Sequence, residues 1–343
     1  MSEINTSRLG KRKAKRKKQI IIMTSVALLI MVAFTSYGIH LYSKADSVLS
    51  NAYEDDGKEK SDLRDTVVDP KFDNVSILFM GVDSSEKRKN EDSARTDALM
   101  LATLNKDEKS VKLLSIPRDS LVYVPKVGYE TKINHAHAYG GHRATIETVE
   151  NILEIPIDYY MTVNFEAFID VVDSLDGIKM DVPYEFKELN SKDKKNAIHL
   201  KPGTQTLDGE EALALARTRK LDNDIERGKR QQDIIKSIVK RAASIDSILK
   251  YDDMIEAVDG KLKTNMLSSE IKSFVSYGTS GKNLKIETLT LDGQDYQPDS
   301  TYYWQIDEIA LEDTKEILQK HLDLNKSQAK ADSTAEEAAD TTN

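Results

Sequence analysis

The sequence predicts an α/β protein in which helices pack on a mixed central sheet, preceded by one transmembrane helix. The first observation is an alternation of strand and helix patterns through residues 75–323, which is typical of a sheet covered by helices. The second is a stretch without Asp, Glu, Lys or Arg at residues 19–43, close to the N-terminus. The third is the length of 343 residues, which is enough to bury a large core.

A basic segment and the apolar stretch together predict a membrane anchor. Residues 1–18 hold eight Lys and Arg side chains against Glu3, although the whole chain has a net charge of −9. A helix over residues 19–43 covers the roughly 30 Å hydrocarbon core of a bilayer. A cleavable signal peptide has a shorter apolar region, so we expect an uncleaved single-pass anchor in the cell membrane. The positive-inside rule predicts a cytoplasmic N-terminus and an extracellular body.

Composition excludes several classes of function. The chain has no cysteine, which excludes thiolate zinc sites, iron–sulfur clusters and cysteine nucleophiles. A basic tail can be a nucleic-acid arm, but residues 1–18 are too few for a helix-turn-helix module and they adjoin the apolar stretch. We therefore expect no nucleic-acid partner.

The rest of the chain divides by composition. Residues 44–74 are polar and acidic and predict a spacer next to the membrane, whereas residues 324–343 have almost no large apolar side chain and predict a disordered tail. Between them, residues 75–323 contain no internal repeat and no linker rich in Pro or Gly. We expect one extracellular folded domain.

Apolar runs bounded by polar turns predict the first strands. Residues 75–83 form such a run and end in a loop, and residues 98–104 and 111–117 are two more runs joined by a polar turn. Apolar side chains three and four residues apart predict an amphipathic helix over residues 142–155.

The same two patterns continue to the end of the domain, interrupted by an irregular charged stretch at residues 187–197. Further strands are predicted at residues 159–165, 177–186 and 285–291. Further helices are predicted at residues 165–175, 208–220, 226–243 and 312–322, the first of them closed by Gly177.

Charged side chains lie at the ends of the first three predicted strands. Asp83 follows the first strand, Arg95 and Asp97 precede the second, and Arg118 and Asp119 follow the third. Asp83 and Asp97 could share a Mg²⁺ ion that bridges phosphate oxygens, while Arg95 and Arg118 bind the phosphates in bidentate fashion. The alternative is that these charges only prevent edge pairing between sheets.

A second cluster, rich in arginine, lies between the two helices at residues 208–220 and 226–243. Arg217 and Arg219 end the first helix, and Arg227, Arg230 and Gln231 open the second. Such a composition suits a pyrophosphate site. The alternative is a solvated helix hairpin.

A loop is predicted before the helix at residues 142–155, and this loop and the first residue of the helix carry Lys132 and three histidines. His135, His137 and His142 could ligate zinc, but no helical metalloprotease pattern follows. We interpret Lys132 as a phosphate partner and Gly140–Gly141 as the tight turn into the helix. The sequence has no GxxxxGK[ST], GxGxxG or GxSxG motif, so nucleotide hydrolysis, dinucleotide binding and serine-esterase chemistry have no motif support.

Taken in order, these motifs resemble those of the LytR-CpsA-Psr family. The matching segments are SILFMGVDSS, SARTDALML, LLSIPRDS, TKINHAHAYGG, NFEAFIDVVDSLDGIKMDV, LDGEEALALARTR and ERGKRQQ. The resemblance implies an α/β/α fold that encloses a hydrophobic tunnel for a polyprenyl chain. It also implies a membrane-anchored phosphotransferase that moves an anionic glycopolymer, such as wall teichoic acid or capsule, from undecaprenyl pyrophosphate to peptidoglycan.

The resemblance also implies roles for individual residues. Asp83 and Asp97 match the magnesium ligands of the family, where Mn²⁺ could replace Mg²⁺, and Arg118, Asp97 and Arg219 are the expected catalytic residues. The chain departs from many relatives at Ile225, where an aromatic residue is common. The expected pyrophosphate-binding residues are Arg95, Arg118, Lys132, Arg217, Arg219, Arg227 and Gln231.

Two other functions stay open at this point. One is a tethered envelope regulator that binds polyprenyl phosphates without turnover, and the other is a hydrolase that releases the polymer to water. If the chain is a transferase, Asp97 or Asp119 is a candidate base for the acceptor hydroxyl.

Overall fold

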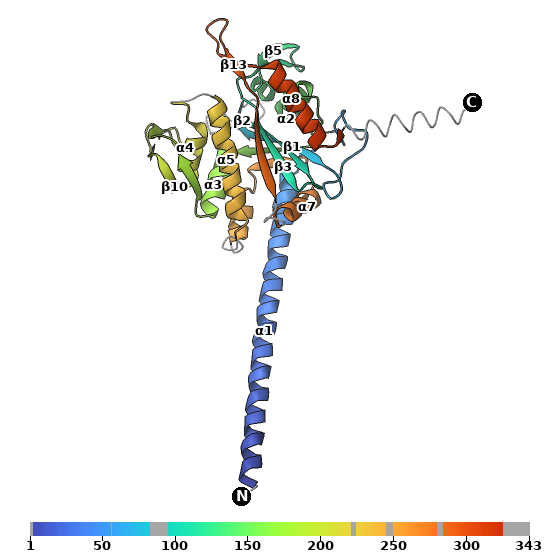
Figure 1. Cartoon of the computed structure of the whole chain (residues 1–343), viewed down its shortest axis with the longest axis vertical. Helices are drawn as coiled ribbons and strands as arrows, with labels where there is room; N and C mark the ends of the chain where they lie inside the picture. The colour runs from blue at the N-terminus through green and yellow to red at the C-terminus, as the bar shows by residue number, and fades with distance from the viewer. Residues whose placement is uncertain are drawn as a thin grey trace, which may run out of the picture. The chain divides into compact units, whose positions relative to one another are not determined.

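The computed structural model describes residues 3–55, 57–82, 95–220, 224–244, 250–279 and 284–324 of the chain (Figure 1). The chain forms two compact units, Met1–Ser47 and Val48–Asn343.

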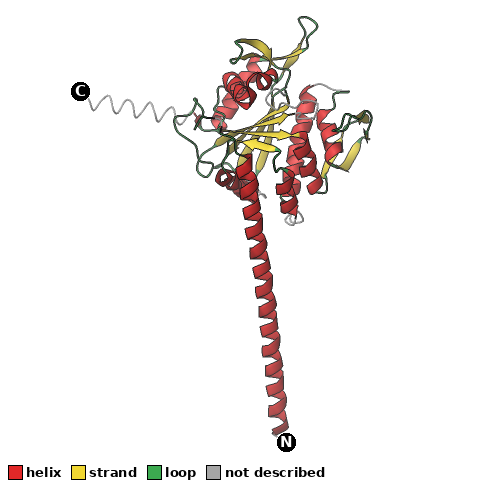
Figure 2. Ribbon diagram, turned by 180° about the vertical axis from the view of Figure 1, so that it is seen from behind, coloured by secondary structure: helices red, strands yellow, loops and turns green. Residues whose placement is uncertain are grey.

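The N-terminal unit is helical. Helix α1 runs from Glu3 to Ala52 (Figure 2), so its last residues belong to the second unit. Within the described residues, Met23–Ala52 is the one helical stretch long and apolar enough to cross a membrane. The helix does not stop at the predicted boundary after Ser43 but continues for two more turns into the predicted spacer.

The second unit is built on a six-stranded mixed sheet with the order β11-β6-β1-β2-β3-β12. β1 pairs antiparallel with β2 and parallel with β6, β3 pairs parallel with β12, and β11 pairs antiparallel with β6. The predicted mixed sheet is therefore confirmed. Its strands are β1 (Val75–Val82), β2 (Thr96–Asn105), β3 (Ser110–Ser115), β6 (Tyr159–Asn164), β11 (Leu262–Thr264) and β12 (Lys285–Thr290).

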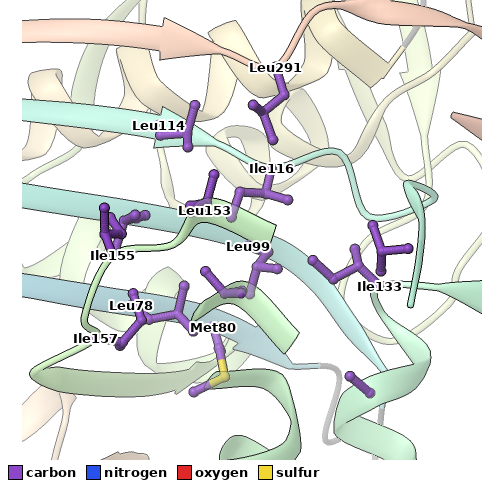
Figure 3. Packing of buried hydrophobic residues seen from close by; sticks show 14 of the residues in the cluster. Leu78, Met80, Leu99, Leu114, Ile116, Ile133, Leu153, Ile155, Ile157 and Leu291 are labelled. Carbon is purple, nitrogen blue, oxygen red and sulfur yellow. The ribbon is translucent and has the colours of Figure 1, made fainter. Parts of the chain in front are cut away.

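Helices cover both faces of the sheet, as expected for an α/β/α fold (Figure 2). On one face, α2 (His135–Leu153) and α8 (Glu308–His321) pack on Leu78, Leu99 and Leu114 through a fully buried apolar cluster (Figure 3). Side chains alternate between the two faces along each strand, so the neighbours of these leucines in the sequence point to the opposite face of the sheet. On that face α3 (Phe165–Ser174), α5 (Asp224–Ala242) and α7 (Ser268–Thr279) pack on the sheet. Helices α4 (Gly209–Arg217) and α6 (Tyr251–Ala257) pack against α3.

Short two-stranded ribbons surround this core. Their strands have three to five residues each, and most of them were not predicted. They are β4 (Leu121–Val124) with β5 (Tyr129–Lys132), β7 (Ile178–Val182) with β10 (Gly203–Leu207), β8 (Phe186–Glu188) with β9 (Ile198–Leu200), and β13 (Gly293–Tyr296) with β14 (Tyr303–Ile306).

Two local predictions were wrong. The segment before residue 142 is not a loop, because α2 already begins at His135. Gly140 and Gly141 interrupt this helix as a kink, with Gly141 at φ 63°, a region that L side chains rarely adopt. Asp97 is the second residue of β2 and does not precede the strand.

Candidate functional site

A cavity of about 660 Å³ lies between the sheet and helices α3, α4 and α5. Its walls are mostly apolar side chains, among them Phe79, Met161, Phe168 and Ile235. The charged and amide side chains that join this lining are Asp97, Arg118, Asn164, Glu188, Arg217, Arg219, Arg227 and Gln231. The cavity therefore has a mainly apolar lining, and the guanidinium groups of several arginines also line it.

Three local structures place the arginines. Arg118 follows β3 after Pro117. Helix α4 is fixed at its start by a capping box in which Asp208 and Glu211 satisfy each other's backbone N–H groups, and it delivers Arg217 in its last turn. Arg227 lies in the first turn of α5.

Buried carboxylates hold the cationic groups together. Asp119 Oδ1 lies 2.9 Å from Lys132 Nζ, and Asp119 Oδ2 lies 3.5 Å from Arg219 Nη1. Asp224 Oδ1 lies 3.2 Å from Arg227 Nη1 and 3.5 Å from Arg219 Nε. Arg219 thus bridges the two carboxylates. The side chains of Asp119 and Asp224 are only 6% and 3% exposed, so they work as internal counter-ions.

Some polar atoms at this site make no hydrogen bond. Arg118 Nε and Arg219 Nη2 are buried nitrogens without a hydrogen bond. Arg118 Nε lies 3.7 Å from Asp119 Oδ2, beyond hydrogen-bond distance, and another nitrogen of Arg118 is paired with Asp97. A buried donor that stays unsatisfied costs about 1–3 kcal/mol. Donors left free beside a cavity are the arrangement expected of a site that receives an anion.

Burial shifts the ionisation of this network. Burial raises the pKa of Asp224, and the neighbouring Arg227 guanidinium opposes that shift. Burial also lowers the pKa of Arg227, again opposed by the charge of its partner. The opposite charges of Asp224 and Arg227 therefore balance each other inside the site.

The structure brings most of the predicted site residues together. Lys132 does not line the cavity and joins the group through Asp119. Arg95 is exposed and acts electrostatically on His135 and Tyr139, outside the cavity lining. The predicted residues on the cavity wall are Asp97, Arg118, Arg217, Arg219, Arg227 and Gln231.

The predicted metal ligands are only partly described. Asp83 lies outside the described residues. Val82, which precedes it, pairs with Thr96, which precedes Asp97. Within the described residues, no three His, Asp or Glu side chains gather to hold a metal. An ion here would take one or two carboxylates and complete its shell with water and phosphate oxygens, which is the usual protein coordination of Mg²⁺.

The histidines and Ile225 lie outside the cavity lining. His135 Nδ1 is 2.9 Å from Thr131 Oγ1, and the His142 ring stacks on Tyr160. Ile225 is half-buried at the start of α5.

The sequence analysis does not predict the roles of two buried residues at this site. Asp224 was not singled out, although its spacing of three from Arg227 predicts an ion pair on one helix face. Arg230 was named only as part of the arginine cluster. It donates from Nε to Leu215 O at 3.2 Å and from Nη2 to Thr218 O at 2.6 Å, which satisfies the C-terminal carbonyls of α4. With Arg227 and Arg230 5% and 8% exposed, the start of α5 is not a solvated face.

Comparison with known proteins gives the same family that the sequence motifs resemble. The profile of the LytR_cpsA_psr family matches residues 36–320. The chain is 39% identical over 319 residues to the polyisoprenyl-teichoic acid–peptidoglycan teichoic acid transferase TagT of Bacillus subtilis, covering 92% of this chain and 98% of the relative. It is 38% identical over 313 residues to the transferase TagV of the same organism, covering 89% and 79%.

The fold is also similar to a solved structure. The LytR-CPS2A-psr family protein YwtF (TagT) with bound octaprenyl pyrophosphate lipid superposes with a TM-score of 0.63 at 37% identity. The superposition covers 78% of this chain and 98% of the other.

Proposed function

This chain belongs to the LytR_cpsA_psr family, and from that premise we propose that it transfers a teichoic-acid-type glycopolymer from a polyprenyl pyrophosphate carrier to peptidoglycan. The observation that carries the proposal is the apolar cavity with buried arginine nitrogens beside it that make no hydrogen bond. The chamber suits the hydrocarbon of the carrier, and the arginines suit its pyrophosphate. The relatives named above are transferases, and one was solved with such a lipid.

The arginines supply the main catalytic effect. The acceptor hydroxyl gives up its proton to a base and attacks the phosphorus that carries the glycopolymer, so that a phosphodiester forms as the bond to the bridging oxygen breaks. Negative charge then grows on the leaving polyprenyl phosphate. Arg118 and Arg219, each with a buried nitrogen that makes no hydrogen bond, bind that charge more strongly in the transition state than in the ground state. A Mg²⁺ ion, or Mn²⁺ in its place, held by Asp97 and Asp83 would neutralise further phosphate charge.

The two candidate bases have different surroundings. Asp97 lines the cavity, whereas Asp119 is buried and contacts Lys132 and Arg219. Asp119 therefore serves to hold the cations, and Asp97 is the carboxylate with access to an acceptor hydroxyl.

The N-terminal helix belongs to the same proposal. It anchors the enzyme in the membrane, with the basic residues 1–18 in the cytoplasm and the folded unit outside. The anchor keeps the site near a carrier lipid that is confined to the same membrane, which raises the effective concentration of the donor.

The decisive experiment follows labelled lipid-linked polymer during incubation of the full-length protein with peptidoglycan. Polymer covalently attached to peptidoglycan supports the transferase. Polymer released free in solution would instead show a hydrolase. Lipid that co-purifies without any product, with Mg²⁺ present, would show a binding protein or regulator.

A further inference from the structure

The β13–β14 hairpin, whose strand β13 is labelled in Figure 1, carries a polar aromatic surface that the proposed donor site does not use. Gln294 is paired with Gln305 and Tyr296 with Tyr303 in its antiparallel ladder. Because successive pairs alternate between the two faces of a ribbon, these four residues share one face, which we call the tyrosine face. Trp304 lies on the other face and is buried.

The tyrosine face is organised before any ligand arrives. The rings of Tyr296 and Tyr303 have centroids 6.5 Å apart. Gln294 Nε2 donates to Gln305 Oε1 at 3.1 Å. Three of the four side chains are exposed and Tyr303 is half-buried. The surface thus offers two flat rings next to amide donors and acceptors, with no aliphatic side chain among its residues.

This face is directly connected to the arginine site. Trp304 N donates to Asp119 O at 2.9 Å, so β14 is attached to the residue that holds the cations. Lys132 Nζ lies 5.6 Å from the ring centroid of Tyr303 and 2.9 Å from the Asp119 carboxylate. A ligand on the tyrosine face would therefore lie close to Lys132, which joins the arginine site through Asp119.

We propose that the tyrosine face binds the sugar rings of the peptidoglycan acceptor and orients its hydroxyl toward the donor phosphate. A pyranose ring has an apolar C–H face that stacks on a phenol ring, and its hydroxyl and N-acetyl groups hydrogen-bond to amides such as those of Gln294 and Gln305. The inference rests on the proposed transferase function.

The position of the face favours the acceptor over the donor. None of its four residues lines the cavity, so they form open surface outside the chamber that suits the donor lipid. An open ribbon surface accommodates a glycan strand that continues in both directions. Lys132, which is paired with Asp119 and lies beside the Tyr303 ring, brings a positive charge to the edge of this face that complements the carboxylate of an acidic amino sugar.

The first test measures binding of soluble oligosaccharides of alternating N-acetylglucosamine and N-acetylmuramic acid to the full-length protein in nanodiscs. Replacing both rings, Tyr296→Ala with Tyr303→Ala, should raise the dissociation constant about tenfold or more. Tyr296→Phe with Tyr303→Phe keeps the rings and should bind within about twofold of the parent. Phe72→Ala, which truncates an aromatic side chain that is 73% exposed and outside the hairpin, is the matched control.

The second test separates this inference from the proposed function. In the transfer assay, the double alanine variant should raise the KM for acceptor while the amount of co-purified donor lipid stays unchanged. An unchanged acceptor KM and oligosaccharide affinity, in a protein that still transfers polymer, would overturn the inference and leave the transferase intact. A parent without transfer that still binds oligosaccharide through these rings would overturn the transferase alone. If the alanine variant loses cooperative thermal unfolding, Gln294→Ala with Gln305→Ala replaces it under the same criteria.

Discussion

A guanidinium group removed from water has to find acceptors for its N–H groups, and Arg118 and Arg219 each keep one buried nitrogen without a hydrogen bond. The cost of leaving these donors free is recovered only when an anion binds. At the scale of single residues, this is the feature that most directly indicates a phosphate ligand.

The planar geometry of the arginine guanidinium group contributes to phosphate binding as well as its charge. Arg118→Lys and Arg219→Lys should each lower transfer about tenfold to a hundredfold, because a lost charge-assisted hydrogen bond costs about 1.5–3 kcal/mol and lysine cannot bind in bidentate fashion. Arg143→Lys, at an exposed position of α2, is the control. Lysine variants with parental rates in the polymer-attachment assay would remove both arginines from the mechanism.

The metal is tested at Asp97. Asp97→Asn keeps the shape of the side chain but removes a charge from a site for a hard cation, so attachment should fall while the carrier lipid still co-purifies. Excess Mg²⁺ or Mn²⁺ should partly restore the rate of this variant and not that of Arg118→Lys. Rates that respond neither to chelator nor to Asp97→Asn would contradict the metal proposal.

At the scale of elements, α8 is attached to the sheet by a buried histidine. His321 is 2% exposed. Its Nδ1 lies 2.7 Å from Thr103 Oγ1 and its Nε2 lies 2.8 Å from Ser110 Oγ. Burial, assisted by the charge of Lys112, lowers the pKa of His321 from 6.5 to about 4. The neutral ring is therefore the form that links α8 to β2 and β3.

This histidine predicts a loss of stability in mild acid. Its native pKa lies below its unfolded value, so its contribution is complete above pH 6.5 and is lost as the pH falls from 6.5 to about 4. The free energy of unfolding should drop by about 2 kcal/mol between pH 7 and pH 5 from this group. Urea unfolding at the two pH values measures it. His321→Gln should remove that part of the pH dependence, whereas His199→Gln, at an exposed pair with Glu185, should not.

A close contact with β3 sets the position of α5, the helix that carries Arg227 and Arg230. A Cβ atom on Gly228 would lie 2.5 Å from Ser115 Oγ and 3.0 Å from Ser115 Cβ. Gly228→Ala should therefore displace α5, destabilise the domain by about 1–3 kcal/mol and weaken transfer. Urea unfolding and the attachment assay check both effects. Combining it with Ser115→Gly should recover part of the activity, and a fully active single variant would show that the contact does not position the site.

At the scale of the whole molecule, the anchor is the feature to test. A reporter fused after Asn343 should be active outside the cell, and protease added to intact protoplasts should digest the folded unit, because the positive-inside rule predicts that the basic residues 1–18 stay in the cytoplasm. A cytoplasmic protein expressed in the same cells is the control for membrane integrity. Protection of the folded unit until the cells are lysed would show the opposite orientation.

The sequence by itself determined the long elements of this protein. The apolar stretch at residues 19–43, the strands β1, β2, β3 and β6 and the helices α3, α4 and α5 have continuous local patterns that need no distant partner to be recognised. It also identified the arginines at the ends of β3 and α4 and at the start of α5, since charges at element ends are visible as motifs.

Only the tertiary structure decided the rest. Strands as short as β4, β5, β13 and β14 have too few residues for a periodic signal, and they exist because a partner completes their hydrogen bonds. The roles of Asp119, Asp224 and Arg230 depend on contacts between residues distant in sequence, such as the Asp119–Arg219 pair. The physical reason is the same in both cases: burial and pairing are properties of the folded chain, and composition alone does not specify which charges meet.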